Sequence, residues 1–341
     1  MPLHDSACFF RFILKSAWEA LSDLLLRSRS EYPWRQRLQA LESENHESLR
    51  GRWAIVTGSN SGIGFETARL LATAGLGVIL ACRNEERGKA AESALNTLLE
   101  QDAQRDHLAG PVEFKNLDVA DLVSVQAFVQ DVRDRSIAVL VCNAGVLAVP
   151  WSLTPQGHEI SLGTNHLGHA LLAQLLLPTL KKHSPSRIVF VSSRSQEGRQ
   201  LRPELFRKTT EAPPNFDRFG IYSIVKAAQL CYILKLAEEV GSGEVAIHAV
   251  HPGCVNTSIT QNFPLRRVME SLKACSDHFL MISLVEAASY VFRACVAADA
   301  APEAGTGLYF HCGQMCPTNG PADNPENCAV AWRLTQEALA S

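Results

Sequence analysis

The sequence has little excess charge and no long hydrophobic run. Its 341 residues carry 32 Lys and Arg against 35 Asp and Glu, which gives a formal net charge of −3. Without a basic excess we expect no nucleic-acid partner, because the phosphate backbone is bound chiefly through Lys and Arg. No stretch approaches the roughly 18 uninterrupted apolar residues of a spanning helix, so we also expect no membrane crossing.

The cysteines have no recurring spacing. All ten are scattered along the chain, and no segment has the pattern of a cleavable secretory signal. This use of cysteine fits a reducing compartment, the cytoplasm, where thiols are small apolar core residues and disulfides are not expected. One cluster suggests zinc, but its spacing matches no common site and we expect no metal: His311, Cys312, Cys316 and Cys328.

Apolar residues, at 46% of the chain, are plentiful. From Arg52 onward they form short runs that alternate with longer helical patterns, which is typical of βαβ units. The expected strands cover residues 53–57, 77–81, 112–115, 138–142, 187–192, 246–251 and 307–310. We therefore predict an α/β doubly wound Rossmann fold over residues 51–341, with a seven-stranded parallel sheet and helices on both faces. Residues 196–217, rich in Arg, Pro and Glu, are predicted to be a surface insertion.

The first 50 residues have a different pattern. Between positions 9 and 26 apolar residues recur at helical spacing, interrupted by charged ones, which predicts an amphipathic helix. This helix either packs on the catalytic domain or a partner subunit, or contacts a membrane surface peripherally as an anchor or scaffold. A mitochondrial presequence is the third alternative, and the acidic residues at positions 5, 19, 23 and 31 argue against it. Residues 32–50 are charged, lack an apolar period and are interpreted as a linker.

A glycine-rich motif follows the first expected strand and opens a helical pattern: Thr57, Gly58, Ser59, Asn60, Ser61, Gly62, Ile63 and Gly64. Gly58 permits a tight turn, Gly62 lets the backbone approach a pyrophosphate, and Gly64 lets helix and strand pack closely. The helix N-terminus offers unpaired N–H groups and a partial positive charge. A turn that needs glycine for geometry alone has the same letters, but the position in the first βαβ unit favours a dinucleotide site.

The residue after the second strand distinguishes between NAD and NADP. An NAD enzyme carries an acid there to bind the ribose 2′-hydroxyl, whereas this chain has Arg83 followed by Asn84. A guanidinium can bind a 2′-phosphate bidentately and stack on adenine, so Arg83 predicts NADP (NADPH). The alternative is a solvated arginine for which Glu85 and Glu86 compete.

Two further strand ends complete the expected cleft, because ligands of open α/β sheets bind beyond the carboxyl ends of the strands. The third strand leads to Asp118 and Val119, with Asp118 placed to accept a hydrogen bond from the adenine amino group. The fourth leads to Asn143, Ala144 and Gly145. Asn143 either contacts the cofactor or bridges backbone groups between strands.

Tyr222 has a lysine four residues later, Lys226, so both lie on one face of a helix. The preceding strand ends at Ser192 and Ser193, and the next one at Pro252-Gly253. With the glycine motif and Asn143-Ala144-Gly145, these residues stand in the order seen in short-chain dehydrogenases/reductases, a family that the sequence resembles. Residues 165–169, Asn-His-Leu-Gly-His, resemble its retinol-dehydrogenase-like branch. The chain is also similar to the catalytic portion of oxidoreductases that carry WW domains, but its first 50 residues show no WW-like pattern.

The resemblance implies an NADP-dependent oxidoreductase with a site of Asn165, Ser193, Tyr222 and Lys226. A phenol with a reference pKa of about 10 is a poor base, but the Lys226 ammonium favours the phenolate, which makes Tyr222 the general acid/base. Ser193, favoured over Ser192 by the family pattern, would hold the substrate oxygen. Asn165 resembles the residue that keeps a relay water in line, or else it caps a helix kink.

The resemblance also implies how the nicotinamide and the substrate are held. Residues Pro252, Gly253, Val255 and Thr257 would lie against the nicotinamide, with Thr257 bonding its carboxamide. Residues 257–281 are apolar with a few charges and would form a lid, which suggests a lipophilic retinoid, steroid or related aldehyde. The family resemblance further suggests a homodimer through the helix that carries Tyr222. The alternative function is an NADPH-binding regulator with little turnover.

Overall fold

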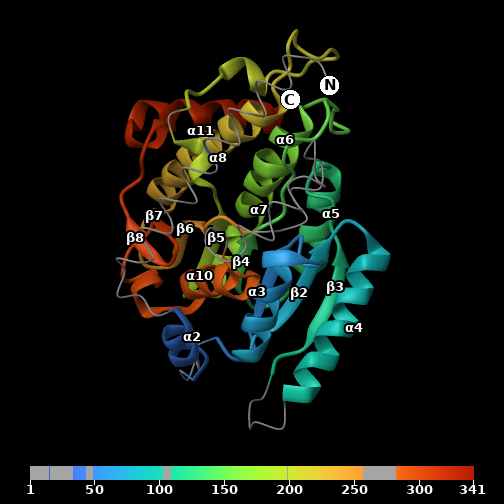
Figure 1. Cartoon of the computed structure of the whole chain (residues 1–341), viewed down its shortest axis with the longest axis vertical. Coiled ribbons are helices and arrows are strands. Elements are labelled where there is room, and N and C mark those ends of the chain that lie inside the picture. The colour runs from blue at the N-terminus through green and yellow to red at the C-terminus, as the bar shows by residue number, and fades with distance from the viewer. Residues whose placement is uncertain (1–14, 16–33, 44–48, 103–108, 198, 256–281) are drawn as a thin grey trace.

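The computed structural model describes residues 15, 34–43, 49–102, 109–197, 199–255 and 282–341. Within these residues eight strands form one sheet in the order β3-β2-β1-β4-β5-β6-β7-β8 (Figure 1). The strands are β1 Trp53–Thr57, β2 Gly77–Cys82, β3 Val112–Asn116, β4 Ile137–Cys142, β5 Ser186–Val191, β6 Val245–His251, β7 Leu308–His311 and β8 Gln314–Cys316. The first seven pair in parallel, which makes this the predicted doubly wound α/β fold.

The seven predicted strands are all present, and each end lies within one residue of its expected position. The sheet nevertheless has eight strands rather than seven and is not wholly parallel, because β8 pairs antiparallel with β7. The two residues between them, Cys312 and Gly313, have φ angles of 47° and 78°. Positive φ at both positions is what a two-residue hairpin loop requires. A strand of three residues is too short to show a hydrophobic alternation, so the sequence pattern does not reveal it.

Helices cover both faces of the sheet and form two hydrophobic cores (Figure 1). One core contains residues of α2 Trp34–Ser43, α3 Gly62–Thr73, α4 Glu85–Asp102 and α10 Leu284–Val296. The other contains residues of α5 Leu122–Val132, α7 Gly168–Lys182, α8 Arg218–Val240 and α11 Pro325–Ala340. Strands β2, β4 and β6 are buried along their whole length, as expected of parallel strands covered on both faces.

The interpretation of residues 32–50 as a linker is wrong for part of that stretch. Helix α2 occupies Trp34–Ser43, and its Leu38 and Leu41 are buried in the core that contains α10. Trp34 also packs against this core, so the apolar residues of the helix recur at i, i+4 and i+7, a period that is only two turns long and is set among polar neighbours. The predicted amphipathic helix at 9–26, Lys15 apart, and the predicted lid at 257–281 lie outside the described residues.

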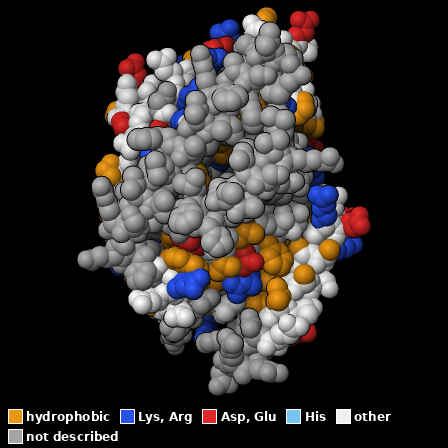
Figure 2. Space-filling model, viewed as in Figure 1, with side chains coloured by type: hydrophobic (Ala, Val, Ile, Leu, Met, Phe, Trp, Pro, Cys, Tyr) orange, Lys and Arg blue, Asp and Glu red, His pale blue; other side chains and the backbone are white. Residues whose placement is uncertain are grey.

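In the described part of the chain, α8 is long and apolar enough to cross a membrane, judged by length and composition. However, 83% of its most apolar 18-residue window is buried inside the protein. Its Tyr232 stacks on Trp332 of α11, with ring centroids 5.3 Å apart. This burial is typical of the core helix of a folded domain. On the face seen in Figure 2, basic and acidic side chains are interspersed over the part of the surface that the structure describes.

Candidate active site

The glycine motif connects β1 to the first turn of α3. Gly58 and Gly62 have φ angles of 64° and 65°, in the left-handed region that favours glycine. Ser61 is the N-cap of α3, but its side chain makes no capping hydrogen bond, so it satisfies none of the N–H groups of the first turn. A Cβ on Gly64 would lie 2.5 Å from the side-chain nitrogen of Asn143. The turn therefore combines a close approach of backbone with N–H groups suited to an anion.

Thr57 fastens this turn to the end of β4. Its hydroxyl oxygen accepts hydrogen bonds from the backbone N–H groups of Asn143 and Ala144, both at 2.9 Å, and lies 2.9 Å from His169 Nε2. The side-chain amide of Asn143 donates to the Thr57 carbonyl at 2.8 Å. Asn143 thus makes the bridging contacts that were one of its two expected roles. Ser59 also faces inward, since it is fully buried and its hydroxyl donates to the Val56 carbonyl.

The other predicted residues of the glycine motif and of the loop after β4 are partly buried. Asn60 and Ile63 are half-buried in the turn and the first turn of α3, and Gly145 is half-buried in the loop after β4. The carboxyl ends of β1 and β4 are adjacent in the sheet. The predicted diphosphate-binding residues therefore belong to one edge of the sheet.

Arg83 lies at the exposed end of β2, with its side chain 71% exposed. Its guanidinium is 3.8 Å from the Asp118 carboxylate, which is a loose ion pair. Of the two competing acids, Glu85 pairs instead with Lys89 at 2.7 Å. Arg83 and Asp118, predicted from different strand ends, therefore lie side by side, with the guanidinium accessible to a ligand.

The two neighbours of these residues have local roles. The side-chain oxygen of Asn84 accepts a hydrogen bond from the backbone of Arg87 at 2.8 Å, in the first turn of α4. Val119 is buried beside the loop that follows β3. Val119 is therefore shielded from solvent, whereas Asn84 is exposed like Arg83.

Tyr222 and Lys226 lie on the buried side of α8, at 8% and 6% exposure. The Lys226 nitrogen is 6.0 Å from the centre of the Tyr222 ring. It donates to the carbonyl of Val191 at 2.7 Å and to the side-chain oxygen of Gln229 at 3.0 Å. Burial lowers the pKa of Lys226 to about 8. The lysine is therefore held against the end of β5, two residues before Ser193.

Ser193 and Ser192 differ in their surroundings. Ser193 is half-buried, has an extended backbone, and its hydroxyl accepts from the backbone of Ser195 at 3.2 Å in the short helix η3 Arg194–Gln196. The hydroxyl of Ser192 is buried and finds no hydrogen-bond partner among the described residues. Helix α8 packs against η3, so Ser193 and the helix that carries Tyr222 and Lys226 are neighbours.

Asn165 lies in a π-helical turn, η2 Gly163–Leu167, between α6 Ile160–Leu162 and α7. It is fully buried, and its side chain makes a pair of hydrogen bonds with the backbone of Val146, at 2.7 and 2.9 Å. Its own carbonyl accepts from the side-chain amide of Gln229 at 2.6 Å. From its π-turn, Asn165 therefore holds the loop after β4, and π-turns of this kind are frequent at functional sites.

Beyond β6 the chain turns at Pro252 and Gly253, both buried. Gly253 has a φ of 94°, and a Cβ there would lie 2.9 Å from the Ile282 side chain. Val255 forms a parallel bridge with Ile282, and Thr257 lies outside the described residues. In the described part of the chain no group of three His, Cys, Asp or Glu side chains is arranged to hold a metal ion.

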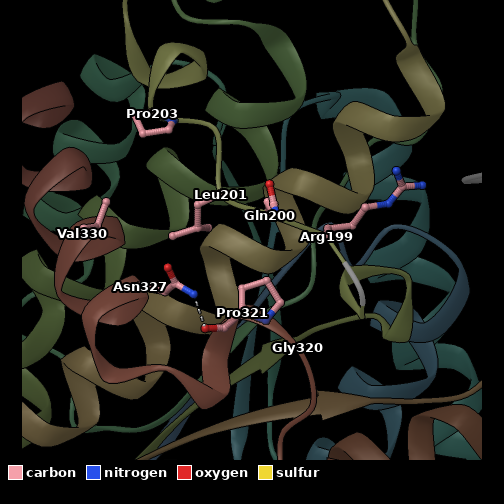
Figure 3. Close-up of a pocket in the computed structure, with 8 residues that line it drawn as sticks. All are labelled: Arg199, Gln200, Leu201, Pro203, Gly320, Pro321, Asn327 and Val330. Atoms are coloured by element: carbon pink, nitrogen blue, oxygen red, sulfur yellow. Dashed lines mark hydrogen bonds between the residues drawn. The ribbon is translucent and has the colours of Figure 1, made fainter.

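A pocket of about 600 Å³ opens between the segment after η3 and the start of α11 (Figure 3). Its lining residues are Arg199, Gln200, Leu201, Pro203, Gly320, Pro321, Asn327 and Val330. Asn327 does not point into free space, because its amide donates to the Pro321 carbonyl at 3.0 Å. None of the predicted site residues lines this pocket, so it is distinct from the candidate active site.

Gln229 and His169 were not anticipated from the sequence. Both are buried polar residues that contact expected ones, Gln229 through Lys226 and His169 through Thr57. Burial lowers the pKa of His169 to about 3, with a smaller contribution from the charge of Lys226. The available signal for Gln229 was its place three residues after Lys226, as an amide in an otherwise apolar run of α8.

Known proteins identify the family. A family model described as short chain dehydrogenase matches residues 52–203. The WW domain-containing oxidoreductase of Pongo abelii is 34% identical over 313 residues, which cover 89% of this chain and 72% of that protein. Retinol dehydrogenase 14 of Mus musculus is 33% identical over 252 residues, which cover 72% and 74%. The chain belongs to the short-chain dehydrogenase family and is an oxidoreductase.

The fold is shared with solved structures. One is the L-sorbose reductase of Gluconobacter frateurii, complexed with NADPH and L-sorbose, which aligns with a TM-score of 0.58 at 20% identity. The alignment covers 81% of this chain and 98% of that one. At this identity the likeness concerns the fold alone.

Proposed function

We propose that this enzyme uses NADP(H) to interconvert a lipophilic carbonyl compound and its alcohol. The observation that carries the proposal is the pair Tyr222 and Lys226, buried on one side of α8, with Lys226 bonded to the end of β5 beside Ser193. A buried ammonium near a phenol favours its ionised form, which makes Tyr222 suited to give and take a proton near neutral pH.

In the direction of reduction, the Tyr222 hydroxyl donates its proton to the oxygen of the substrate carbonyl. The Ser193 hydroxyl holds the same oxygen by a hydrogen bond and stabilises the negative charge that develops there. When bound, NADPH supplies the hydride for the carbonyl carbon. Lys226 stabilises the tyrosinate that remains, and the π-turn with Asn165 holds the loop after β4 in place.

The residues present fit a dinucleotide with a 2′-phosphate. The N–H groups at the start of α3, which Ser61 does not cap, suit a diphosphate. Arg83 is exposed and only loosely paired with Asp118, so it can turn to a phosphate. The L-sorbose reductase, whose fold this chain shares, is itself complexed with NADPH.

A lipophilic substrate, a retinoid, steroid or related aldehyde, is proposed from two observations. Among the relatives of this chain is a retinol dehydrogenase that is 33% identical. The segment 257–281, which lies outside the described residues, is apolar with a few charges. We also propose that residues 51–341 form the catalytic domain. We further propose that the protein works in the cytoplasm, a reducing compartment, because all eight cysteines that the structure describes are free thiols.

The test is NADPH oxidation by the purified chain with retinaldehydes, steroid ketones and simple aldehydes, alongside Tyr222→Phe. We expect the variant to lose turnover by at least about 100-fold, the usual contribution of a general acid, while it still binds NADPH. Tight NADPH binding without turnover of any compound would instead favour a cofactor-binding regulator.

Peripheral membrane contact through residues 9–26 is a separate proposal, based on the amphipathic pattern of that segment. Co-sedimentation of the full chain with liposomes tests it. Deletion of residues 1–30 should abolish the sedimentation, and equal sedimentation of both forms would contradict the proposal.

A further inference from the structure

Gln229 carries a polar amide in the least accessible part of α8. It is 1% exposed, and its neighbours along the helix are Ala227, Ala228 and Leu230. An amide in such surroundings destabilises the fold unless its groups are hydrogen-bonded. The contacts of Gln229 therefore indicate what keeps it there.

Both ends of the Gln229 amide bond to residues of the candidate site. Its oxygen accepts from the Lys226 ammonium at 3.0 Å, and its nitrogen donates to the Asn165 carbonyl at 2.6 Å. Asn165 is itself fixed, because its side chain is bonded to the backbone of Val146. Together with the Val191 carbonyl, Gln229 places the Lys226 nitrogen between the end of β5 and the π-turn.

We propose that Gln229 is a positioning residue that fixes the Lys226 ammonium and links it directly to the Asn165 carbonyl. In the family that the sequence resembles, Asn165 matches the residue that keeps a relay water; here the amide of Gln229 takes that carbonyl. A side-chain amide donates and accepts hydrogen bonds but does not ionise near neutral pH. It therefore holds Lys226 in place without passing a proton along this link. The inference rests on the proposed function only in treating Lys226 as a site residue.

Among the residues that the structure describes, those around Lys226 supply little compensating charge. The titratable groups that face it come from β4, from the segment η2 to α7 and from its own helix: Cys142, His166, His169 and Tyr222. Burial raises the pKa of the Cys142 thiol and lowers the pKa of both imidazoles to about 3, so these three are uncharged near neutral pH. The ammonium therefore depends on neutral acceptors, of which Gln229 supplies one and Val191 another.

The first experiment measures the titration of Lys226 in the cofactor-free protein by NMR of ¹⁵N-labelled lysine, with Lys226→Met to identify the signal. Gln229→Leu removes the acceptor, so we expect the midpoint to fall by about one pH unit, a tenfold change in proton affinity. Gln229→Glu adds a carboxylate at the same place, so the midpoint should rise by about one unit or more. The matched control is Gln174→Leu, which removes an amide whose hydrogen bond within the described part of the chain is to the Tyr232 hydroxyl, at 2.8 Å, and should leave the midpoint unchanged.

The second experiment measures NADPH affinity by fluorescence at pH 7. The family resemblance implies that the Lys226 ammonium also binds the ribose hydroxyls of the nicotinamide nucleotide. We therefore expect Gln229→Leu to weaken NADPH binding about tenfold, through the displaced ammonium, and Gln174→Leu to leave it within twofold. If the unaltered protein does not bind NADPH, the proposed function is wrong, and the lysine titration still decides the role of Gln229. An unchanged Lys226 midpoint in both Gln229 variants overturns the proposal. Gln229→Glu, which keeps the shape and the acceptor oxygen, serves if the leucine variant does not fold.

Discussion

Arg83 is the residue on which the proposed preference for NADP depends. Its exposed guanidinium is 3.8 Å from Asp118 and has no closer ion pair among the described residues. We expect Arg83→Glu to lower NADP affinity about 10- to 100-fold, because charge-assisted bonds to a phosphate contribute about 1.5–3 kcal/mol. Affinity for NAD should change much less. Isothermal titration with both cofactors measures the two values.

Arg87→Glu is the matched control for Arg83. Arg87 is an exposed arginine in the first turn of α4, and the variant changes the net charge by the same amount. It should leave the ratio of the two affinities close to that of the unaltered chain. Equal affinities for NAD and NADP in the unaltered protein would contradict the preference itself.

Single residues of the candidate site were predictable where the residues that act together are also close together in the sequence. Tyr222 and Lys226 are one helical turn apart, and the glycine motif is continuous, so both are visible in the sequence. Gln229 contacts a carbonyl 64 positions away, and His169 contacts a hydroxyl 112 positions away. Contacts over such separations exist only once the sheet has brought its carboxyl ends together, so composition and spacing do not reveal them.

Among the elements, strands that are buried on both faces were the most predictable. Their continuous apolar runs, as in β4 and β6, place the strand ends within one residue. The elements that were missed are short: α2, β8 and the π-turn η2. Each is stabilised by tertiary contacts or by a local turn, and none has a long periodic pattern in the sequence. A short apolar pattern cannot be distinguished from that of a loop.

Helix α10 ends against a buried arginine of β5. The Arg187 guanidinium donates to four carbonyls at and just beyond that helix end: Cys295, Val296, Ala297 and Ala300. Arg187→Met would remove the guanidinium donors from these buried carbonyls, of which only Ala297 and Ala300 have another partner among the described residues, the Ala300 N–H and His248, so we expect a loss of about 2–4 kcal/mol in the free energy of unfolding. Urea denaturation measures the loss.

The variant Arg333→Met provides the comparison for Arg187. Arg333 forms an exposed pair with Glu337 on α11, at 2.8 Å, and its removal should change stability by less than about 0.5 kcal/mol. NADPH affinity should remain the same in Arg187→Met, because Arg187 lies at the amino end of β5 and the proposed cofactor site lies at the carboxyl ends. Similar losses of stability in both variants would contradict the capping role.

For the whole molecule, three buried histidines determine part of the dependence of stability on pH: His166, His169 and His248. Burial lowers the pKa of the first two to about 3 and that of His248 to about 4. An unfolded chain takes up these protons near pH 6.5, earlier than the folded one, so stability present above that pH is lost as the pH falls toward 4. Each histidine contributes a slope of about 1.4 kcal/mol per pH unit.

Urea denaturation at pH 7.5, 6.5 and 5.5 measures this dependence. The curve should be shallower for His248→Gln, whose side chain can still donate to the Ala300 carbonyl that His248 contacts at 3.0 Å. The same slope in that variant would show that His248 does not contribute.

The arrangement of α8 and α11 affects how copies of the chain associate. The family resemblance suggested a dimer through the helix that carries Tyr222, but α11 packs along α8 in this structure. The contact includes the stacked rings of Tyr232 and Trp332 and a bond of 2.7 Å between His166 and Thr335. We therefore expect light scattering to give the mass of a monomer, 37.3 kDa. A stable dimer that crosslinks through α8 would contradict this.

The three-residue strand β8 has a further consequence for the sheet as a whole. Without it, β7 would present a row of unpaired backbone groups along one side of the sheet. Open edges of this kind recruit strands from other chains and promote aggregation. Because β8 folds back over β7 and is itself too short to template another strand, the hairpin at Cys312 and Gly313 protects this edge against intermolecular β-pairing.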